Sequence, residues 1–293
     1  MKQENFSFIS DLVKKRSGLV LTMDKIYLLE SRLAPLARKE GEASIDDLIT
    51  KIRLKGTEAL KSAVTEAMTT NESFFFRDKK PFDHLSEVIL PHMVKNRNSS
   101  AKLRIWCCAA STGQEPYSIG MVLKENQAKF GKLRTEILGT DISSQVLEKA
   151  KAGIYSQFEV QRGMPIQLLV KYFTQKGENW EINPEIKAMA TYRYFNLLDS
   201  YASLGKWDIV FCRNVLIYFD QETKKDILDR IAKQMNPDAY LLLGAAETVL
   251  GVSDAFKPVE GHRGLYGLSA AAGAKTDEGS KPGLAAFANL KSA

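Results

Sequence analysis

Two segments of this chain have the residue types of a site for a nucleoside. The first is a strand-like run from Leu103 that turns through Gly113 into a helix opening at Pro116, and the second is a short apolar run that ends in Asp141. In α/β sheets, a turn of small residues lets the backbone approach a ligand, and an acid at the tip of the next strand accepts hydrogen bonds from ribose hydroxyls. The pattern therefore predicts that the chain binds an adenosine-type cofactor.

The turn around Gly113 differs from the phosphate-binding turns of dinucleotide enzymes. It lacks the second and third glycines of the pattern G-x-G-x-x-G, and Glu115 places a carboxylate beside it. That carboxylate would repel a pyrophosphate and would suit a cation such as an ammonium or a sulfonium. Two alternatives stay open: Glu115 could be a first-turn acid that the helix dipole favours, and Asp141 could cap the helix that follows it. The position of Asp141 after the Gly113 turn favours ribose binding.

A third segment combines polar and aromatic residues in a pattern that is not amphipathic. It reads Thr69-Thr-Asn-Glu-Ser-Phe-Phe-Phe-Arg-Asp78. One interpretation is a hydrophobic latch between two domains, with Arg77 in a surface ion pair. The other is a lid, in which Asn71 and Ser73 offer hydrogen bonds, Arg77 offers a fixed charge for a carboxylate, and the rings exclude water.

A fourth segment is an apolar strand, residues 207–212, that becomes polar at Arg213 and Asn214, with Tyr218 just beyond. Polar residues at the carboxyl edge of a central strand mark the ligand crevice in open α/β sheets. The alternative is a hydrogen-bonded turn followed by a core tyrosine.

The elements that must position these residues indicate an α/β protein with a helical domain before it. Residues 1–80 show the helical period and no strand signal, and residues 81–100 form a helical connector. Strands alternate with helices over 101–268, apart from a small antiparallel insertion at about 154–195. Residues 269–293 are rich in Ala, Gly, Ser and Lys, which is typical of a disordered tail. We expect a doubly wound, mostly parallel sheet.

Composition is that of an ordinary soluble globular protein. Of the 293 residues, 44% are hydrophobic and 26% are charged, no apolar run approaches the ~20 residues of a membrane span, and the N-terminus lacks the apolar core of a signal peptide. We expect a cytoplasmic protein without membrane insertion. The net charge of +6 comes without a dense basic tract, so nucleic acid is not an expected partner. The three histidines and three cysteines lack metal-ligand spacing, and no metal site is expected.

Taken together, these segments resemble the bacterial chemotaxis receptor methyltransferase family (CheR type). The most specific signatures are Ser-Thr-Gly-x-Glu-Pro-Tyr and Arg-Asn-Val-x-Ile-Tyr-Phe, and the resemblance covers roughly residues 5–268. The matching runs, in the family's order and spacing, are residues 69–71 with 75–77, 109–118, 140–142, 146–155, 196–197 and 211–220.

The resemblance implies a Rossmann-like class I methyltransferase fold with an N-terminal all-helical domain and a small antiparallel β-subdomain. It also implies S-adenosylmethionine as the cofactor and glutamate side-chain carboxylates of receptors as methyl acceptors. With Gly113 of the turn, the positions expected to bind the cofactor are Asn71, Ser73, Arg77, Glu115, Asp141, Asn196, Leu197, Arg213 and Asn214.

The resemblance also implies roles in the reaction and in partner binding. Tyr218 would stand near the transferred methyl group, and it would orient the reactants together with Arg77. Neither would take a proton, because a carboxylate acceptor is already ionised at pH 7. The expected partners are the cytoplasmic helices of methyl-accepting chemoreceptors, contacted through Arg32 and Arg38, although Pro35 interrupts this basic stripe. We expect a monomer.

One departure from the family pattern concerns the segment after the last core strand. Many members have a serine before the glutamate there, whereas this chain reads Gly244-Ala-Ala-Glu247, which weakens the case for a polar contact. Ser73 stands where the family often has threonine, and it keeps the hydroxyl.

Two other functions are compatible with such a sheet. A nicotinamide-dependent oxidoreductase is disfavoured by the missing glycines and by Glu115. A cofactor-binding adaptor without turnover would keep the same cofactor positions, so the sequence leaves it open.

The composition of the C-terminal segment makes a prediction about stability. Deleting residues 272–293 should leave the melting temperature of the protein unchanged, because a segment with few large apolar residues buries little surface. Thermal unfolding followed by circular dichroism checks this, and a large drop would mean that the tail packs on the folded domains.

Overall fold

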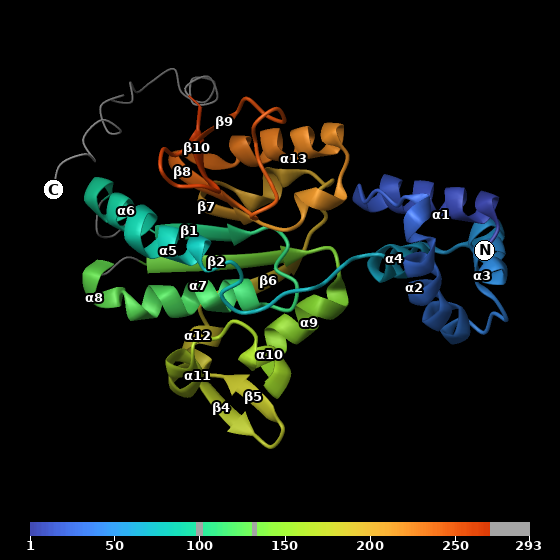
Figure 1. Ribbon diagram of the computed structural model, residues 1–293, viewed down its shortest axis with the longest axis horizontal. Helices are drawn as coiled ribbons and strands as arrows, with labels where there is room; N and C mark the ends of the chain where they lie inside the picture. The colour runs from blue at the N-terminus through green and yellow to red at the C-terminus, as the bar shows by residue number, and fades with distance from the viewer. Residues whose placement is uncertain (98–101, 131–133, 270–293) are drawn as a thin grey trace.

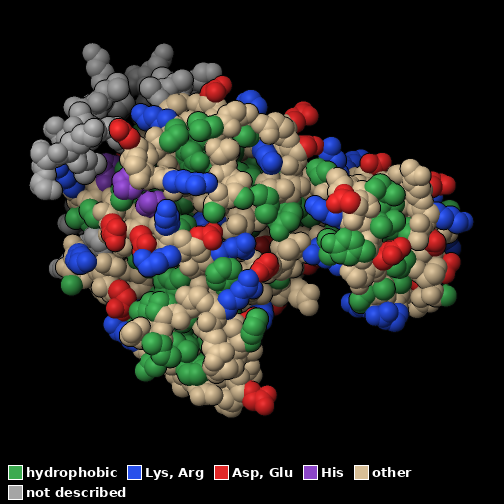
Figure 2. Space-filling model, in the orientation of Figure 1, with side chains coloured by type: hydrophobic (Ala, Val, Ile, Leu, Met, Phe, Trp, Pro, Cys, Tyr) green, Lys and Arg blue, Asp and Glu red, His purple; other side chains and the backbone are tan. Residues whose placement is uncertain are grey.

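The computed structural model describes residues 1–97, 102–130 and 134–269, and it contains a helical N-terminal domain beside an α/β domain (Figure 1). The predicted disordered tail lies outside the described residues, apart from Ser269. Figure 2 shows a hollow between the N-terminal domain and the lower part of the α/β domain, and positive and negative side chains are mixed over the visible face. This face therefore has no large field of one sign.

Four helices build the N-terminal domain. They are α1 (Gln3–Ser17), α2 (Ile26–Lys39), α3 (Ile45–Lys55) and α4 (Glu58–Ala67). The side chains of Ser44 and Thr57 accept backbone N–H groups at the starts of α3 and α4, which supplies partners for amides that a helix end leaves free. Leu29 and Leu33, one turn apart on α2, are fully buried, as their helical spacing predicts.

A helical connector leads from the N-terminal domain to the sheet. It runs through α5 (Lys80–His84), a π-helical turn (Leu85–Ile89) and α6 (Leu90–Asn96) without a break. Its apolar side chains pack in one core with side chains from β1 (Lys102–Cys107) and α7 (Gln114–Glu125).

The central sheet has seven strands in the order β6-β2-β1-β7-β8-β10-β9. Besides β1, they are β2 (Arg134–Asp141), β6 (Ala190–Tyr194), β7 (Trp207–Cys212), β8 (Met235–Leu243), β9 (Phe256–Pro258) and β10 (Leu265–Leu268). The first five pair in parallel, and the last two form an antiparallel hairpin at one edge. The expected mostly parallel sheet is confirmed.

Both faces of the sheet are covered. Ile105 and Cys107 of β1 enter the core that contains α7 and the connector, whereas Trp106 enters the core that contains α13 (Gln221–Lys233) and the N-terminal helices. Successive side chains of a strand point to opposite faces, so this alternation describes a doubly wound sheet. Two further helices are α8 (Gln127–Phe130) and α9 (Ser144–Ala152).

A separate three-stranded antiparallel sheet forms the β-subdomain. Its strand order is β3-β5-β4, with β3 (Ile154–Ser156), β4 (Phe173–Lys176), β5 (Asn179–Ile182) and the short helices α10 (Gln157–Gln161), α11 (Ile166–Tyr172) and α12 (Pro184–Lys187). The predicted insertion at 154–195 extends too far, because β6 pairs in parallel with β2 at the edge of the central sheet. Alternating aromatic and β-branched residues identify a strand, but they do not identify its partner.

Close packing between β2 and β6 explains a glycine in the middle of β2. A Cβ atom on Gly139 would lie 2.8 Å from two ring carbons of Tyr192 and 2.9 Å from the Cβ of Ala110. No side chain fits there without moving the ring or the turn that follows β1, so this contact fixes the distance between the turn and the sheet edge.

Gly139→Ala should therefore destabilise the fold, by about 1–3 kcal/mol for an overpacked core. Gly267→Ala on β10 is the matched control, because nothing lies within 4 Å of a Cβ atom at that position. Urea unfolding of both variants measures the difference. Equal free energies of unfolding would contradict the packing argument.

Candidate functional site

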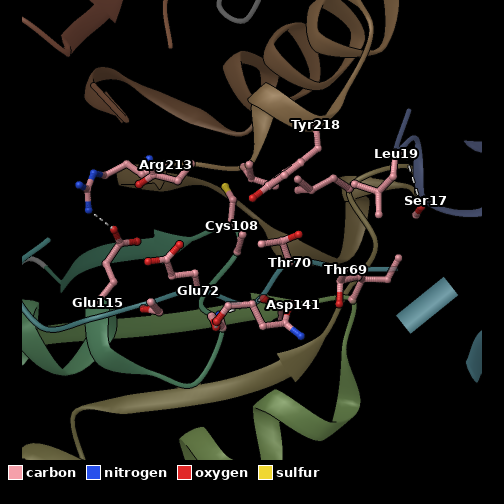
Figure 3. A pocket seen from close by; sticks show the side chains of 18 of the residues that line it. Ser17, Leu19, Thr69, Thr70, Glu72, Cys108, Glu115, Asp141, Arg213 and Tyr218 are labelled. Carbon is pink, nitrogen blue, oxygen red and sulfur yellow. Dashed lines mark hydrogen bonds and ion pairs between the residues drawn. The ribbon is translucent and has the colours of Figure 1, made fainter. Parts of the chain in front are cut away.

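A pocket opens at the carboxyl ends of β1, β2, β6 and β7 (Figure 3). The N-terminal domain and the linker between α4 and α5, residues 68–79, meet the sheet there. The empty space of the pocket is about 880 Å³ with the open solvent at its mouth included, and small-molecule sites are concave in the same way. The carboxyl edge of a parallel sheet is where ligands bind in doubly wound folds.

The pocket collects most of the residues predicted to bind a cofactor or to act in the reaction. Those that line it are Asn71, Ser73, Arg77, Glu115, Asp141, Asn196, Leu197, Arg213, Asn214 and Tyr218. Gly113 is not among the lining residues. It precedes α7 with a φ of 91°, and a Cβ atom there would lie 2.9 Å from the Cβ of Ala150 and from the hydroxyl of Tyr192. The turn and its packing therefore require this glycine, and its role in cofactor binding stays a prediction.

Asp141 joins the turns that follow β1 and β2. Its Oδ2 accepts the backbone N–H of Ser111 at 2.9 Å, and its Oδ1 accepts the backbone N–H of Ser143 at 3.0 Å. Burial raises the pKa of the Asp141 carboxyl, and these two N–H groups oppose the rise. Each carboxylate oxygen can accept more than one hydrogen bond, so Asp141 can anchor both turns and still accept from a ligand.

Arg213 and Glu115 form an ion pair at one end of the pocket, to the left in Figure 3. The Nη1 of Arg213 donates to the Oε2 of Glu115 at 2.6 Å, and its Nη2 donates to the Oδ2 of Asp78 at 2.8 Å and to the carbonyl oxygen of Arg77 at 2.7 Å. Burial raises the pKa of Glu115, and the charge of Arg213 opposes this. Glu115 is thus the fixed partner of a buried guanidinium, a role that neither sequence interpretation included.

The three phenylalanines of the linker point to different surroundings. Phe75 is fully buried in the β-subdomain core, with its ring 5.0 Å from that of Tyr155, and Phe76 packs 5.2 Å from the ring of Phe82 in the connector. Phe74 instead lines the pocket. Phe75 and Phe76 thus join this segment to two cores, as the latch interpretation predicts, whereas the lid stays a prediction with which the position of Phe74 is compatible.

The outer end of the linker is tied to the β-subdomain. Arg162 forms an ion pair with Glu72, and its guanidinium lies 4.4 Å from the ring centre of Phe74, while that of Arg77 lies 5.4 Å from the same ring. A Cβ atom on Gly163 would clash with the carbonyl oxygen of Phe75 at 2.2 Å, so this loop and the linker are in direct contact.

The N-terminal domain completes the pocket. No motif in the sequence predicted this contribution. Ser17 and Leu19 line it, and the backbone N–H of Val20 donates to the carbonyl oxygen of Tyr218 at 2.9 Å. The side-chain amide of Asn196 donates to the carbonyl oxygen of Arg16 at 2.6 Å. These contacts between segments distant in the sequence appear only when the fold is formed.

The two arginines expected to contact a receptor differ in their surroundings. Arg32 is half-buried, and its guanidinium donates to the carbonyl oxygen of Met68 at 2.7 Å and to the hydroxyl of Thr70 at 2.9 Å. Arg38 is exposed. Arg32 thus also holds the start of the linker. Its hydrogen-bond partner Thr70 lines the pocket.

The charged side chains of the pocket sum to a net negative charge. Its lining contains three carboxylates and two guanidinium groups, which gives −3 + 2 = −1 when all are ionised; these residues are Glu72, Glu115, Asp141, Arg77 and Arg213. Such a lining fits a ligand with a positive charge better than one with a pyrophosphate. Among the described residues, no group of His, Cys, Asp and Glu could hold a metal ion, and no helix is long and apolar enough to cross a membrane.

Comparisons with known proteins agree over both domains. Residues 71–265 match the family described as "CheR methyltransferase, SAM binding domain", and residues 4–69 match "CheR methyltransferase, all-alpha domain". The chain is 42% identical over 257 residues to chemotaxis protein methyltransferase Cher2 of Pseudomonas putida, covering 86% of this chain and 93% of that protein. It is 42% identical over 265 residues to chemotaxis protein methyltransferase 1 of Pseudomonas aeruginosa, covering 89% and 96%.

A more distant relative extends the same similarity. Chemotaxis protein methyltransferase of Borreliella burgdorferi is 32% identical over 257 residues, covering 85% of this chain and 89% of that protein. The two matched domains meet within the linker whose residues line the pocket. The chain belongs to the CheR methyltransferase family, and its α/β domain is an S-adenosylmethionine-dependent methyltransferase domain.

Proposed function

We propose that this chain transfers the methyl group of S-adenosylmethionine to glutamate side-chain carboxylates of chemoreceptors, forming methyl esters that serve chemotactic adaptation. The observation that carries the proposal is the pocket at the carboxyl edge of the sheet. It joins Asp141, the Arg213–Glu115 pair and Tyr218 in one negatively charged lining. The family membership supplies the methyl chemistry.

The side chains that line the pocket match the chemical groups of S-adenosylmethionine. Asp141 offers carboxylate oxygens to the ribose hydroxyls. The side chains of Asn71, Ser73 and Asn214 offer hydrogen bonds to the polar ends of the cofactor, and the net charge of the lining favours its sulfonium.

When bound, this cofactor supplies a methyl group on a positively charged sulfur. The acceptor glutamate needs no general base, because its carboxylate is ionised at pH 7. Arg77 and Tyr218 orient the acceptor, and Leu19 and Phe74 exclude water from the same space. Excluding water favours a reaction in which opposite charges are neutralised, and positioning lowers its entropic cost.

The acceptor glutamates belong, in this proposal, to the cytoplasmic helices of chemoreceptors, and the protein acts as a cytoplasmic monomer. Arg38 is exposed on α2 and is available to an acidic partner. Arg32 lies on the same helix and contacts the linker that lines the pocket. A partner bound at this helix therefore lies close to the reaction site. Charge attraction across such a surface chiefly raises the rate of encounter.

Methyl transfer to purified receptor fragments tests this function directly. With labelled S-adenosylmethionine, the chain should label the fragments, and mild alkali should release the label because carboxylate esters are base-labile. A non-catalytic adaptor would bind the cofactor and leave the fragments unlabelled.

Tyr218→Phe separates positioning from binding in that assay. Loss of the hydroxyl should lower kcat by about tenfold or more, because orientation of the reacting groups is lost. The affinity for S-adenosylhomocysteine should change little. Tyr266→Phe on β10, outside the pocket lining, is the control. An unchanged kcat in Tyr218→Phe would remove Tyr218 from the reaction.

Asp141→Ala tests the ribose assignment. We expect the dissociation constant of S-adenosylhomocysteine to rise by about tenfold or more, because hydrogen bonds to charged groups contribute about 1.5–3 kcal/mol. Glu148→Ala on α9 should leave it unchanged, since that exposed carboxylate pairs with Lys151 and is absent from the lining. Titration calorimetry measures both, and equal constants would refute the assignment.

A further inference from the structure

A carboxylate outside the pocket organises one of its walls. Glu247 follows β8, is 9% exposed, and is absent from the pocket lining. Its two oxygens accept four backbone N–H groups, from Gly244 at 2.7 Å, Asn214 at 2.8 Å, Val215 at 2.9 Å and Leu216 at 2.8 Å. A carboxylate has about four lone-pair sites, so this one is fully satisfied by backbone amides.

These bonds hold a segment of irregular backbone. Asn214 has a φ of 56°, in the left-handed region that asparagine adopts more readily than most residues other than glycine. The amides of residues 214–216 also lie at the start of the 3₁₀ turn Leu216–Tyr218, where backbone N–H groups lack partners within the turn. Glu247 supplies both the acceptors and a negative charge at the start of that turn.

The backbone of Gly244 leaves room for this arrangement. A Cβ atom there would lie 2.7 Å from the Oε2 of Glu247 and 2.9 Å from the Nδ2 of Asn214. The ends of β7 and β8 are thus joined at a close contact in which the carboxylate, the glycine and the asparagine fit together.

The segment held by Glu247 carries three lining residues of the pocket, Asn214, Val215 and Tyr218. We propose that Glu247 is a positioning residue, which fixes Asn214 and Tyr218 for the cofactor and the acceptor without touching either ligand. This inference rests on the proposed cofactor site. The departure from the family pattern at residues 244–247 weakened the case for a polar contact there, whereas Glu247 accepts four hydrogen bonds.

Glu247→Gln tests the inference, because glutamine keeps the size of the side chain and replaces one acceptor oxygen by a donor NH₂ group. The new NH₂ group would face backbone N–H groups, which are also donors, so no hydrogen bond could form between them. Asp208→Asn is the control: Asp208 is 1% exposed at the opposite end of β7, where it accepts the backbone N–H of Arg104 at 2.7 Å and forms an ion pair with Arg97. Each variant loses a buried carboxylate that holds one end of β7, so both should have lower melting temperatures.

Two measurements distinguish positioning from stability. Without any ligand, and well below the melting temperature, amide hydrogen exchange at residues 214–216 should speed up in Glu247→Gln and stay unchanged in Asp208→Asn. In calorimetry, the dissociation constant of S-adenosylhomocysteine should rise about tenfold or more in Glu247→Gln, as loss of bonds to a charged group predicts, and less than about twofold in Asp208→Asn.

A double-mutant cycle shows whether Glu247 acts through Asn214. Adding Glu247→Gln to Asn214→Ala should weaken S-adenosylhomocysteine binding less than Glu247→Gln does alone, whereas its effect should add to that of Asp141→Ala. If Glu247→Gln does not fold, Glu247→Asp takes its place, since the shorter side chain keeps the charge but cannot reach all four amides.

Unchanged exchange and affinity in Glu247→Gln, or equal losses in the Asp208→Asn control, would overturn the inference. Failure of the wild-type protein to bind S-adenosylhomocysteine would instead overturn the proposed cofactor site. The ligand-free exchange measurement would still report whether Glu247 holds the segment.

Discussion

The buried ion pair between Arg213 and Glu115 is the interaction on which the geometry of the pocket depends. The side chain of Arg213 is 2% exposed, and a charge removed from water in this way is costly unless it is paired and hydrogen-bonded. Glu115 therefore keeps the first turn of α7 against the end of β7. Asp78 and the carbonyl oxygen of Arg77 bring the linker to the same guanidinium. One side chain thus joins three segments that surround the ligand space.

The same principle recurs around the pocket, because two other buried carboxylates satisfy backbone amides of its turns. Asp141 joins the turns after β1 and β2, and Glu247 holds the turn after β7. The N-terminal domain closes the remaining side through Leu19 and through the bond from Val20 to Tyr218. The proposed cofactor site therefore shares a wall with the N-terminal domain, and the pocket forms only when both domains are in place.

The sequence predicted the sheet and many of the residues that line the pocket, because these depend on local patterns. A strand, a small-residue turn and an acid led to Asp141, and a strand that becomes polar led to Arg213 and Asn214. What it could not predict depends on tertiary contacts. The partner of β6 is one such case. Leu19 reaches the pocket from another domain, and Glu247 acts through amides 31–33 residues away. Gly113 does not line the pocket, and its role in cofactor binding stays a prediction; a Cβ atom there would meet Ala150 and Tyr192, which no local pattern indicates.

In the proposed function, this pocket holds S-adenosylmethionine by its ribose at Asp141, with the reactive sulfur toward Tyr218. A crystal structure of the protein with S-adenosylhomocysteine tests it most directly. We predict ribose hydroxyls within hydrogen-bonding distance of the Asp141 carboxylate and the sulfur on the Tyr218 side of the pocket. A ligand bound elsewhere, or a carboxylate of Asp141 turned away from the ribose, would contradict the account.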